Sequence, residues 1–178
     1  MDLQRFITEH EMSDSLQDFF SRTIRFHQVK NFREIKGPVG IPDHVLVRII
    51  GPNIVYAVAF ELKLKDWKKG LIQAFRYKAY ANSSFVVIDE RFVHKAVENI
   101  SAFRRAQVGL ASYSIDCQFR VIFNPKPRKP FSKVLAEKFA EQTRMIFSGQ
   151  EFSKVSDRFI RSTSGMIDVN VFENSKRY

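Results

Sequence analysis

Cysteine is nearly absent from this chain of 178 residues, which contains only Cys117. A lone cysteine excludes an intramolecular disulfide and any zinc or iron-sulfur site built from several thiolates, and it is typical of a reducing compartment. Long hydrophobic runs are missing too, since the longest, Ile54–Phe60, is far below the roughly twenty residues of a membrane-spanning helix. The first residues lack the cationic start and apolar run of a signal peptide. We therefore expect a cytoplasmic protein with no membrane partner.

Acidic residues are scarce relative to basic ones, because 29 Lys and Arg stand against 19 Asp and Glu, giving a formal charge of +10. This excess favours a polyanionic partner, since cationic side chains displace the counterions condensed on a phosphate backbone. The alternative is that the charge only keeps the protein soluble. Hydrophobic residues make up 44% of the sequence and include 18 Phe, enough to build one folded core in a chain of this length.

The pattern of apolar residues predicts a mixed order of helices and strands. Helical spacing predicts helices over 11–27, 66–81, 92–103 and 132–146, with Asp66, Asp89 and Ser132 as N-caps. Runs of β-branched and aromatic residues predict strands over 43–50, 54–64, 85–88, 108–114 and 117–123, and a strand or link over 31–36. Asp116 is expected in the last turn, and Cys117 in the core. This order predicts an α/β fold in which helices flank a central mixed β-sheet.

Two segments are expected along the chain. Residues 124–130 hold three prolines and three cations, which predicts an extended, exposed linker. We therefore divide the chain into a core over 1–123 and a basic linker with a helical C-terminal extension over 124–178, packed on the same domain. The part from Ser148 onward gives no clear pattern.

The two strands over 43–50 and 54–64 carry the most informative geometry. Turn-forming residues at 51–53 separate them, which predicts a β-hairpin. A symmetric three-residue loop would place Asp43 directly opposite Glu61, with both side chains on one face. Lys63 shares that face because side chains alternate along a strand. A register shift of one residue would separate them.

Two carboxylates beside an ammonium in an apolar hairpin need a physical reason, because like charges repel and buried charge is costly. A hard divalent cation such as Mg²⁺ supplies one, since it prefers oxygen ligands and makes a bound water easier to deprotonate for attack on a phosphodiester. Lys63 could position that water or stabilise charge on the phosphate. The alternative is that Asp43 ends a strand while Glu61 and Lys63 lie on a solvated edge. His44 should point to the opposite face, as a structural histidine.

The same residues resemble a known family of nucleases. Pro42 and Asp43, followed by the triplet Glu61, Leu62 and Lys63, resemble the PD…ExK pattern of the PD-(D/E)XK, or restriction-endonuclease-like, superfamily. Two further elements are similar to the GxxD and QxxxY elements of RecB-like exonuclease domains, and they are formed by Gly40 with Asp43 and by Gln73 with Tyr77. The resemblance covers about residues 10–123, with its motifs confined to 40–77.

The resemblance implies a restriction-endonuclease-like core and a role for each matched residue. Asp43, Glu61 and the backbone carbonyl of Leu62 would ligate Mg²⁺ or Mn²⁺, and Lys63 would assist the nucleophilic water. The family often adds an acid from the first helix, for which we choose Glu11, with Glu9 and Asp14 as alternatives. Gln73 and Tyr77, four residues apart on one helix face, would contact DNA or orient Lys63; ordinary packing is the alternative for Tyr77.

Basic residues surround the proposed site in the sequence. Lys65, Lys68, Lys69 and Arg76 follow the triplet and are predicted to contact phosphates, unless they form a solvated helix face. A second basic group flanks the linker and consists of Lys126, Arg128, Lys129 and Lys133. We therefore expect a Mg²⁺-dependent deoxyribonuclease acting on DNA, alone, as a homodimer or in a larger restriction or repair complex. The alternative is a non-catalytic nucleic-acid-binding module, or a subunit of such an assembly, that keeps the nuclease fold.

Overall fold

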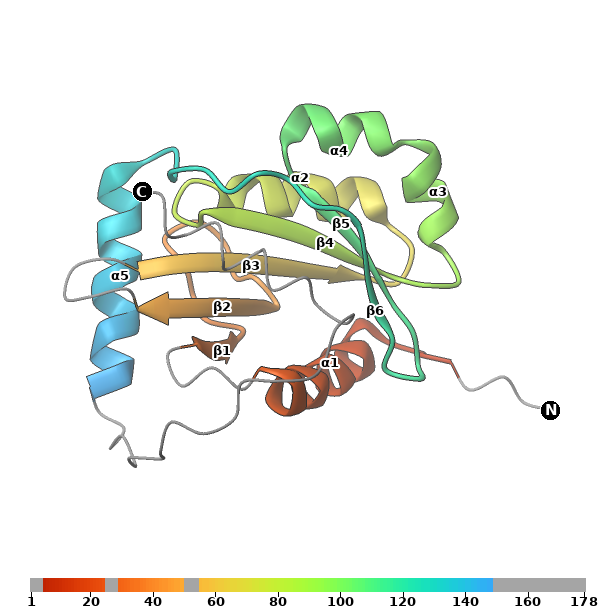
Figure 1. Cartoon of the computed structure of the whole chain (residues 1–178), viewed down its shortest axis with the longest axis horizontal. Helices are drawn as coiled ribbons and strands as arrows, with labels where there is room; N and C mark the ends of the chain where they lie inside the picture. The colour runs from red at the N-terminus through yellow and green to blue at the C-terminus, as the bar shows by residue number, and fades with distance from the viewer. Residues whose placement is uncertain (1–4, 25–28, 50–54, 149–178) are drawn as a thin grey trace, which may run out of the picture.

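The computed structural model describes residues 5–24, 29–49 and 55–148. Helices and strands follow one another along the chain as Figure 1 shows. The helices are α1 (Glu9–Thr23), α2 (Trp67–Tyr77), α3 (Val93–Glu98), α4 (Ile100–Ala106) and α5 (Lys133–Ser148). The strands are β1 (Val29–Arg33), β2 (His44–Ile49), β3 (Val55–Lys63), β4 (Ser83–Asp89), β5 (Gly109–Tyr113) and β6 (Phe119–Phe123). Within these ranges, no helix is long and apolar enough to cross a membrane.

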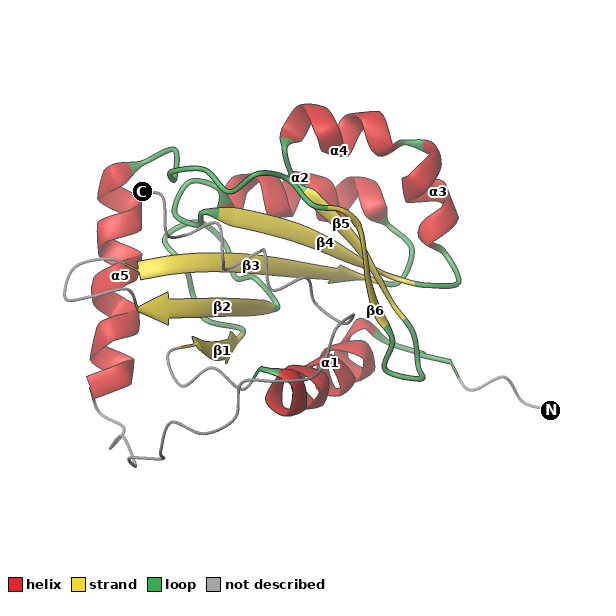
Figure 2. Cartoon of the chain, viewed as in Figure 1, coloured by secondary structure: helices red, strands yellow, loops and turns green. Residues whose placement is uncertain are grey.

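One mixed sheet organises the described chain. Its strands lie in the order β1-β2-β3-β4-β5-β6, with β3, β4 and β5 parallel and the outer neighbours antiparallel. Parallel neighbours need crossover connections, and α2 and the α3–α4 pair provide them. Helices α2, α3 and α4 lie on one face of the sheet and α1 lies on the other (Figure 2). The prediction of an α/β fold with helices flanking a central mixed sheet is confirmed.

The helix caps agree with the sequence at two of three places. The Asp66 side chain accepts a hydrogen bond from Lys69 N at 3.1 Å and begins α2. The Ser132 hydroxyl accepts from Leu135 N at 3.3 Å and begins α5. Both side chains satisfy a backbone N–H that has no partner inside the helix. The first helix begins at Glu9, two residues before the predicted start, because the Thr8 hydroxyl accepts from Glu11 N.

The single helix predicted over 92–103 is wrong, because two short helices meet there at Asn99. The backbone of Asn99 leaves helical geometry (φ −108°, ψ 23°), and its amide nitrogen donates to Lys95 O. Asparagine competes for backbone groups in this way and favours turns over helix interiors. Asp89 caps neither helix. It is the last residue of β4, and its carboxylate pairs with Arg91.

The core position predicted for Cys117 is also wrong. Cys117 is exposed and has a positive φ of 59°, in the turn that joins β5 to β6. Its backbone N–H donates to Ser114 O, and Gln118 N donates to the Ser114 hydroxyl, so the turn is closed before β6 begins. Strand alternation therefore starts only at Phe119. Asp116 lies in this turn, as predicted.

The hairpin register agrees with the prediction. His44 pairs with Phe60 and Val45 pairs with Ala59, so the same register places Asp43 opposite Glu61. The turn predicted at 51–53 lies outside the described residues, but the strands on either side pair as a loop symmetric about Pro52 requires. Eight consecutive residues of β3, from Tyr56 to Lys63, are buried, because helices cover both faces of this central strand.

Each face of the sheet has its own hydrophobic core. On the α1 face, Leu16 and Phe20 pack against Phe60 and Phe119 of the sheet. On the opposite face, the side chains of β2 and β3 pack against α2 and α5, with Tyr80 and Phe139 in contact at a centroid distance of 4.7 Å. Fully burying one such aromatic side chain contributes roughly 1.5–3 kcal/mol. These two cores fix the hairpin between them and determine which residues face α2.

Candidate active site

The site is built at the end of β3, on the face of the sheet that α2 covers. Ala59 of this strand packs in the cluster that contains Tyr77, and the alternation of side chains sends Glu61 and Lys63 to the same face. Asp43 immediately precedes β2 and lies opposite Glu61 in the register. The hairpin therefore brings together the three residues that the sequence analysis selected.

Short polar contacts join the members of this cluster. The Lys63 ammonium donates to Glu61 Oε1 at 2.8 Å, and the Tyr77 hydroxyl donates to Glu61 Oε2 at 2.6 Å. Asp43 Oδ2 accepts from the backbone N–H of Leu62 at 2.6 Å. Glu61 is only 2% exposed and Lys63 only 5%, so each depends on these partners for the hydrogen bonds that water would otherwise supply.

The carboxyl group of Asp43 is held in an unfavourable electrostatic environment. Burial raises its pKa to about 6, and the neighbouring negative charges of Glu61 and Glu9 act in the same direction. The hydrogen bond from Leu62 N and the positive charge of Lys63 oppose this rise but do not cancel it. Asp43 is therefore charged at neutral pH at a cost in stability, which a cation placed beside it would relieve.

Lys63 contacts three oxygen atoms. Besides Glu61, its ammonium donates to the carbonyl of Leu62 at 2.9 Å and to Glu9 Oε2 at 3.2 Å. Burial lowers the pKa of Lys63, but the hydrogen bond and charge of Glu61, with the charges of Glu9 and Asp43, outweigh it and raise the pKa above its ordinary value. Lys63 is therefore fully protonated at neutral pH.

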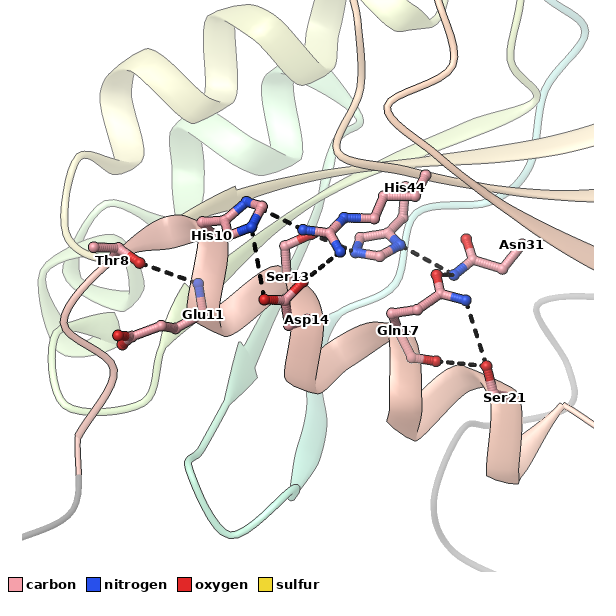
Figure 3. A network of polar contacts seen from close by, with 10 residues as sticks. Thr8, His10, Glu11, Ser13, Asp14, Gln17, Ser21, Asn31 and His44 are labelled. Carbon is pink, nitrogen blue, oxygen red and sulfur yellow. Dashed lines mark hydrogen bonds and ion pairs between the residues drawn. The ribbon is translucent and has the colours of Figure 1, made fainter.

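The acidic residue that α1 contributes to this cluster is Glu9, one of the two alternatives to Glu11. Glu11 instead accepts from Ile7 N at 2.7 Å, and its side chain points away from His10 and His44 in Figure 3. Asp14 pairs with Arg33 at the side of the helix. Helical spacing made all three acids plausible, and only the docking of α1 on the sheet distinguishes them.

Helix α2 approaches the site very closely at Gly70. A Cβ atom at this position would lie 3.0 Å from Lys63 Cγ and 2.8 Å from Val86 Cγ1, so any larger residue would push α2 away from the sheet. One turn later, the amide oxygen of Gln73 is buried without a hydrogen-bond partner among the described residues. An unpaired buried acceptor is costly and is typical of a place where water or a ligand binds.

Tyr77 is anchored by the loop that precedes β2. Its hydroxyl also lies 3.2 Å from the carbonyl of Ile41, a second acceptor for the single proton that it donates to Glu61. Gly40 has φ +72°, and a Cβ there would lie 3.0 Å from Tyr77 Cε1. Burial and the bond to Glu61 raise the pKa of Tyr77, so its hydroxyl stays a proton donor. The GxxD and QxxxY elements therefore meet each other in space, a contact that sequence analysis did not foresee.

His44, next to Asp43, lies on the opposite face as expected. Its ring is fully buried, with Nε2 3.0 Å from Ser13 Oγ and Nδ1 3.0 Å from Asn31 Nδ2 (Figure 3). Because the Asn31 amide nitrogen is a donor, Nδ1 accepts and Nε2 carries the proton. Burial lowers the pKa of His44 to about 4, with the charge of Arg33 acting in the same direction. His44 is thus a neutral structural residue that joins α1 to the sheet.

The oxygen atoms near β3 are of the kind that a hard divalent cation such as Mg²⁺ would require. Mg²⁺ commonly takes one or two carboxylates and keeps several waters, and Asp43, Glu61 and the Leu62 carbonyl offer such a set. Two of these three groups, Glu61 and Leu62, already hold a cation, the ammonium of Lys63. In the described parts of the chain, however, no three His, Cys, Asp or Glu side chains are grouped so that they could hold a metal ion. Protein carboxylates alone therefore would not complete the coordination.

The predicted phosphate contacts lie at the surface beside this cluster. Lys65 is exposed in the connection after β3, and Lys68, Lys69 and Arg76 are exposed on α2. Within the ranges that the structure describes, none of these four forms an ion pair with an acidic side chain. Unpaired surface cations near a site are available to a polyanion.

No known protein family, curated protein sequence or solved structure matches this chain. The geometry around β3, together with the motifs that occupy it, is therefore the basis on which a function can be assigned.

Proposed function

We propose that this protein is a nuclease that hydrolyses DNA phosphodiester bonds with Mg²⁺ or Mn²⁺ through a PD-(D/E)XK site. One observation carries the proposal: Asp43, Glu61 and Lys63 meet at the end of the β2–β3 hairpin, with Tyr77 bound to the same Glu61 carboxylate. A purely structural ion pair would account for Glu61 and Lys63. It would not account for the nearby Asp43 carboxylate, whose raised pKa shows an unrelieved cost of ionisation.

The order of elements supports a restriction-endonuclease-like core as the finer description of the fold. The motif residues lie on an antiparallel hairpin, α2 follows it, and β4 returns parallel to β3. The QxxxY element falls on α2, so that Tyr77 contacts the carboxylate of the ExK triplet. These placements agree with what the sequence resemblance implies for such a core.

In the proposed mechanism, Asp43, Glu61 and the Leu62 carbonyl would hold the divalent ion, which would lower the pKa of a water molecule for attack on phosphorus. The Lys63 ammonium now donates to Glu61 and to the Leu62 carbonyl, so it would have to leave these oxygens to make room for the ion. Its flexible stem would allow the charge to lie beside the phosphate, where it would stabilise negative charge in the transition state. Tyr77 holds the Glu61 carboxylate in its orientation through the 2.6 Å hydrogen bond.

A second candidate is a non-catalytic nucleic-acid-binding module with the same fold. The observation in its favour is that both Glu61 oxygens and Lys63 are already paired within the chain, so this pair needs no ligand to be satisfied. Under this alternative, the basic surface of α2 would bind nucleic acid while the buried ion pair served only stability. Metal binding and strand cleavage separate the two candidates.

The direct test is cleavage of linear, supercoiled, single-stranded and branched DNA with Mg²⁺ or Mn²⁺. We expect at least one substrate to be cut, EDTA to stop the reaction, and Glu61→Gln to lower the rate by at least about a hundredfold. The matched control is Glu98→Gln, which makes the same change at an exposed position of α3 and should leave the rate unchanged.

Calorimetric titration with Mn²⁺ provides a readout that does not depend on finding the right substrate. We expect binding in the wild-type protein and its loss in Glu61→Gln, with Glu98→Gln binding as the wild type does. DNA binding without Mn²⁺ binding, and with every substrate left intact, would support the binding module instead. Participation in a homodimer or a larger restriction or repair complex stays a prediction, to be checked by light scattering.

A further inference from the structure

Two exposed phenylalanines contact each other near the C-terminal end of α2. Phe75 of α2 is 45% exposed and Phe131, in the segment before α5, is 59% exposed. Their rings contact each other, with centroids 5.7 Å apart and planes tilted by 56°. Large apolar side chains placed together at a surface indicate a binding function.

The structure holds this ring pair firmly in place. The backbone N–H of Phe131 donates to Lys78 O at 2.9 Å, and Ser132 N donates to Ala79 O at 3.1 Å, which ties the segment to the end of α2. Lys78 is buried, and its ammonium donates to the carbonyls of Ala106 and Gln107 at 2.9 and 3.0 Å.

That ammonium also lies beneath both rings, 5.1 Å from the Phe131 centroid and 5.8 Å from that of Phe75. Such cation–π contacts engage the protein-facing side of the pair. The large exposed fractions of Phe75 and Phe131 show that the rest of each ring remains accessible to solvent. The pair is therefore a preformed aromatic surface, fixed from beneath and open above.

The charge around the ring pair is of one sign. Helix α2 contains three cations and no acidic residue, and the segment 124–132 likewise contains three cations and no acidic residue. These side chains are all exposed, and they are Lys68, Lys69, Arg76, Lys126, Arg128 and Lys129. The two groups looked separate in the sequence, but the Phe75–Phe131 contact joins them into one surface. We call it the aromatic-basic surface.

We propose that the aromatic-basic surface binds single-stranded nucleic acid, with bases stacked on Phe75 and Phe131 and the phosphates held by the surrounding cations. Aromatic rings interleaved with cations suit unpaired bases, because stacking uses the ring faces while the charge follows the backbone. A base pair in a duplex keeps its ring faces inside the helix, where these two side chains cannot reach them.

This inference extends the proposed function by naming its substrate class. Around the circumference of α2, helical spacing places Lys69 and Arg76 between Phe75 and the side of the helix that carries Gln73 and Tyr77. A strand bound across the outer side of α2 would therefore lead toward the carboxylates at the end of β3. The protein would accordingly prefer single-stranded DNA or duplexes with single-stranded ends.

The test measures binding apart from cleavage, using the full-length Glu61→Gln protein in EDTA. Fluorescence anisotropy compares a labelled oligo-dT strand with an abasic strand of the same length, which keeps the phosphates and lacks the bases. We expect oligo-dT to bind about five- to a hundredfold more tightly. Phe75→Leu with Phe131→Leu should abolish that difference, whereas Phe75→Tyr with Phe131→Tyr should keep it. Circular dichroism verifies that each variant is folded.

Three results would overturn the proposal. Equal affinity for the abasic strand would show that only phosphates are recognised, and full affinity in the leucine variants would place the bases elsewhere. Absence of binding to either strand would show that the surface does not bind nucleic acid, and would favour a protein partner instead. The two proposals fail separately: base-dependent binding without metal-dependent cleavage would refute only the nuclease, and cleavage without base dependence would refute only the aromatic-basic surface.

Discussion

Asp43 and His44 are adjacent in the chain, yet they belong to two very different polar environments. His44 faces α1, where both ring nitrogens have partners and the ring is neutral. Asp43 faces α2, where one oxygen accepts from Leu62 N and the nearby carboxylate of Glu61 repels its charge. Strand alternation alone sends the two side chains to opposite faces of the sheet.

His44 therefore stabilises the fold, whereas the charged carboxylate of Asp43 destabilises it. The pKa values move in opposite senses, since burial raises that of Asp43 to about 6 and lowers that of His44 to about 4. In each case burial favours the neutral form. At neutral pH the histidine has reached that form and the aspartate has not. The unrelieved charge of Asp43 lies on the α2 face, where we propose that the metal ion binds.

The largest expected effect comes from Asp43→Asn, which removes the unrelieved charge. Cleavage should fall at least about a hundredfold because a metal ligand is lost. Stability at neutral pH should rise by roughly 1–3 kcal/mol, since the amide oxygen can still accept from Leu62 N without the cost of burying a charge.

The pH dependence of that gain follows from the raised pKa of Asp43. The folded wild type holds this proton more tightly than the unfolded chain does, so it loses stability as the pH rises from about 4 to about 6. The gain in Asp43→Asn should therefore be small near pH 4 and complete above pH 6. Urea unfolding at several pH values measures it, with Asp116→Asn in an exposed turn as the control. A less stable variant at neutral pH would contradict the contrast between the two faces.

His44→Gln should have the opposite profile, with stability lowered and catalysis spared. It disrupts the contacts to Ser13 and Asn31 in the buried network, at a cost of roughly 1–3 kcal/mol at neutral pH. In the wild type the lowered pKa means that stability is complete above about pH 6.5 and is lost as the pH falls toward 4.

The difference between His44→Gln and the wild type should therefore shrink in acid, as urea unfolding at neutral pH and near pH 4.5 would reveal. Cleavage per folded molecule should stay near the wild-type rate. A large loss of activity in a folded His44→Gln protein would show that the α1 face contributes to the chemistry as well.

The smallest expected effect is that of Gly40→Ala, which alters the support of the site without touching its charges. Alanine is strained at φ +72°, and its Cβ would lie 3.0 Å from Tyr77 Cε1, so we expect a loss of roughly 1–2 kcal/mol. Displacement of Tyr77 should weaken its hydrogen bond to Glu61 and reduce cleavage by a few fold. Ala102→Gly, at a site within α4, serves as a backbone control of similar stability cost. Equal activity per folded molecule in both variants would refute the positioning role of Gly40.

Local patterns determined much of the fold and the central part of the candidate site. Alternation along β3 and a symmetric turn were sufficient to place Glu61 and Lys63 on one face opposite Asp43, because the side-chain period of a strand is fixed by its backbone. The capping side chains of Asp66 and Ser132 likewise act within a few residues. Where local competition is subtle, as at Asn99 and Cys117, the same patterns failed.

Contacts between distant segments were decided only by the tertiary structure. The sequence offered Glu9, Glu11 and Asp14 as candidate acids, and the docking of α1 on the sheet determined that Glu9 contacts Lys63. In the sequence, Phe75 and Phe131 are more than fifty residues apart. They come together because the segment before α5 is hydrogen-bonded to the end of α2. Periodicity assigns a side chain to a face of its own element. Which other element covers that face depends on how whole helices and strands pack, which no local pattern encodes.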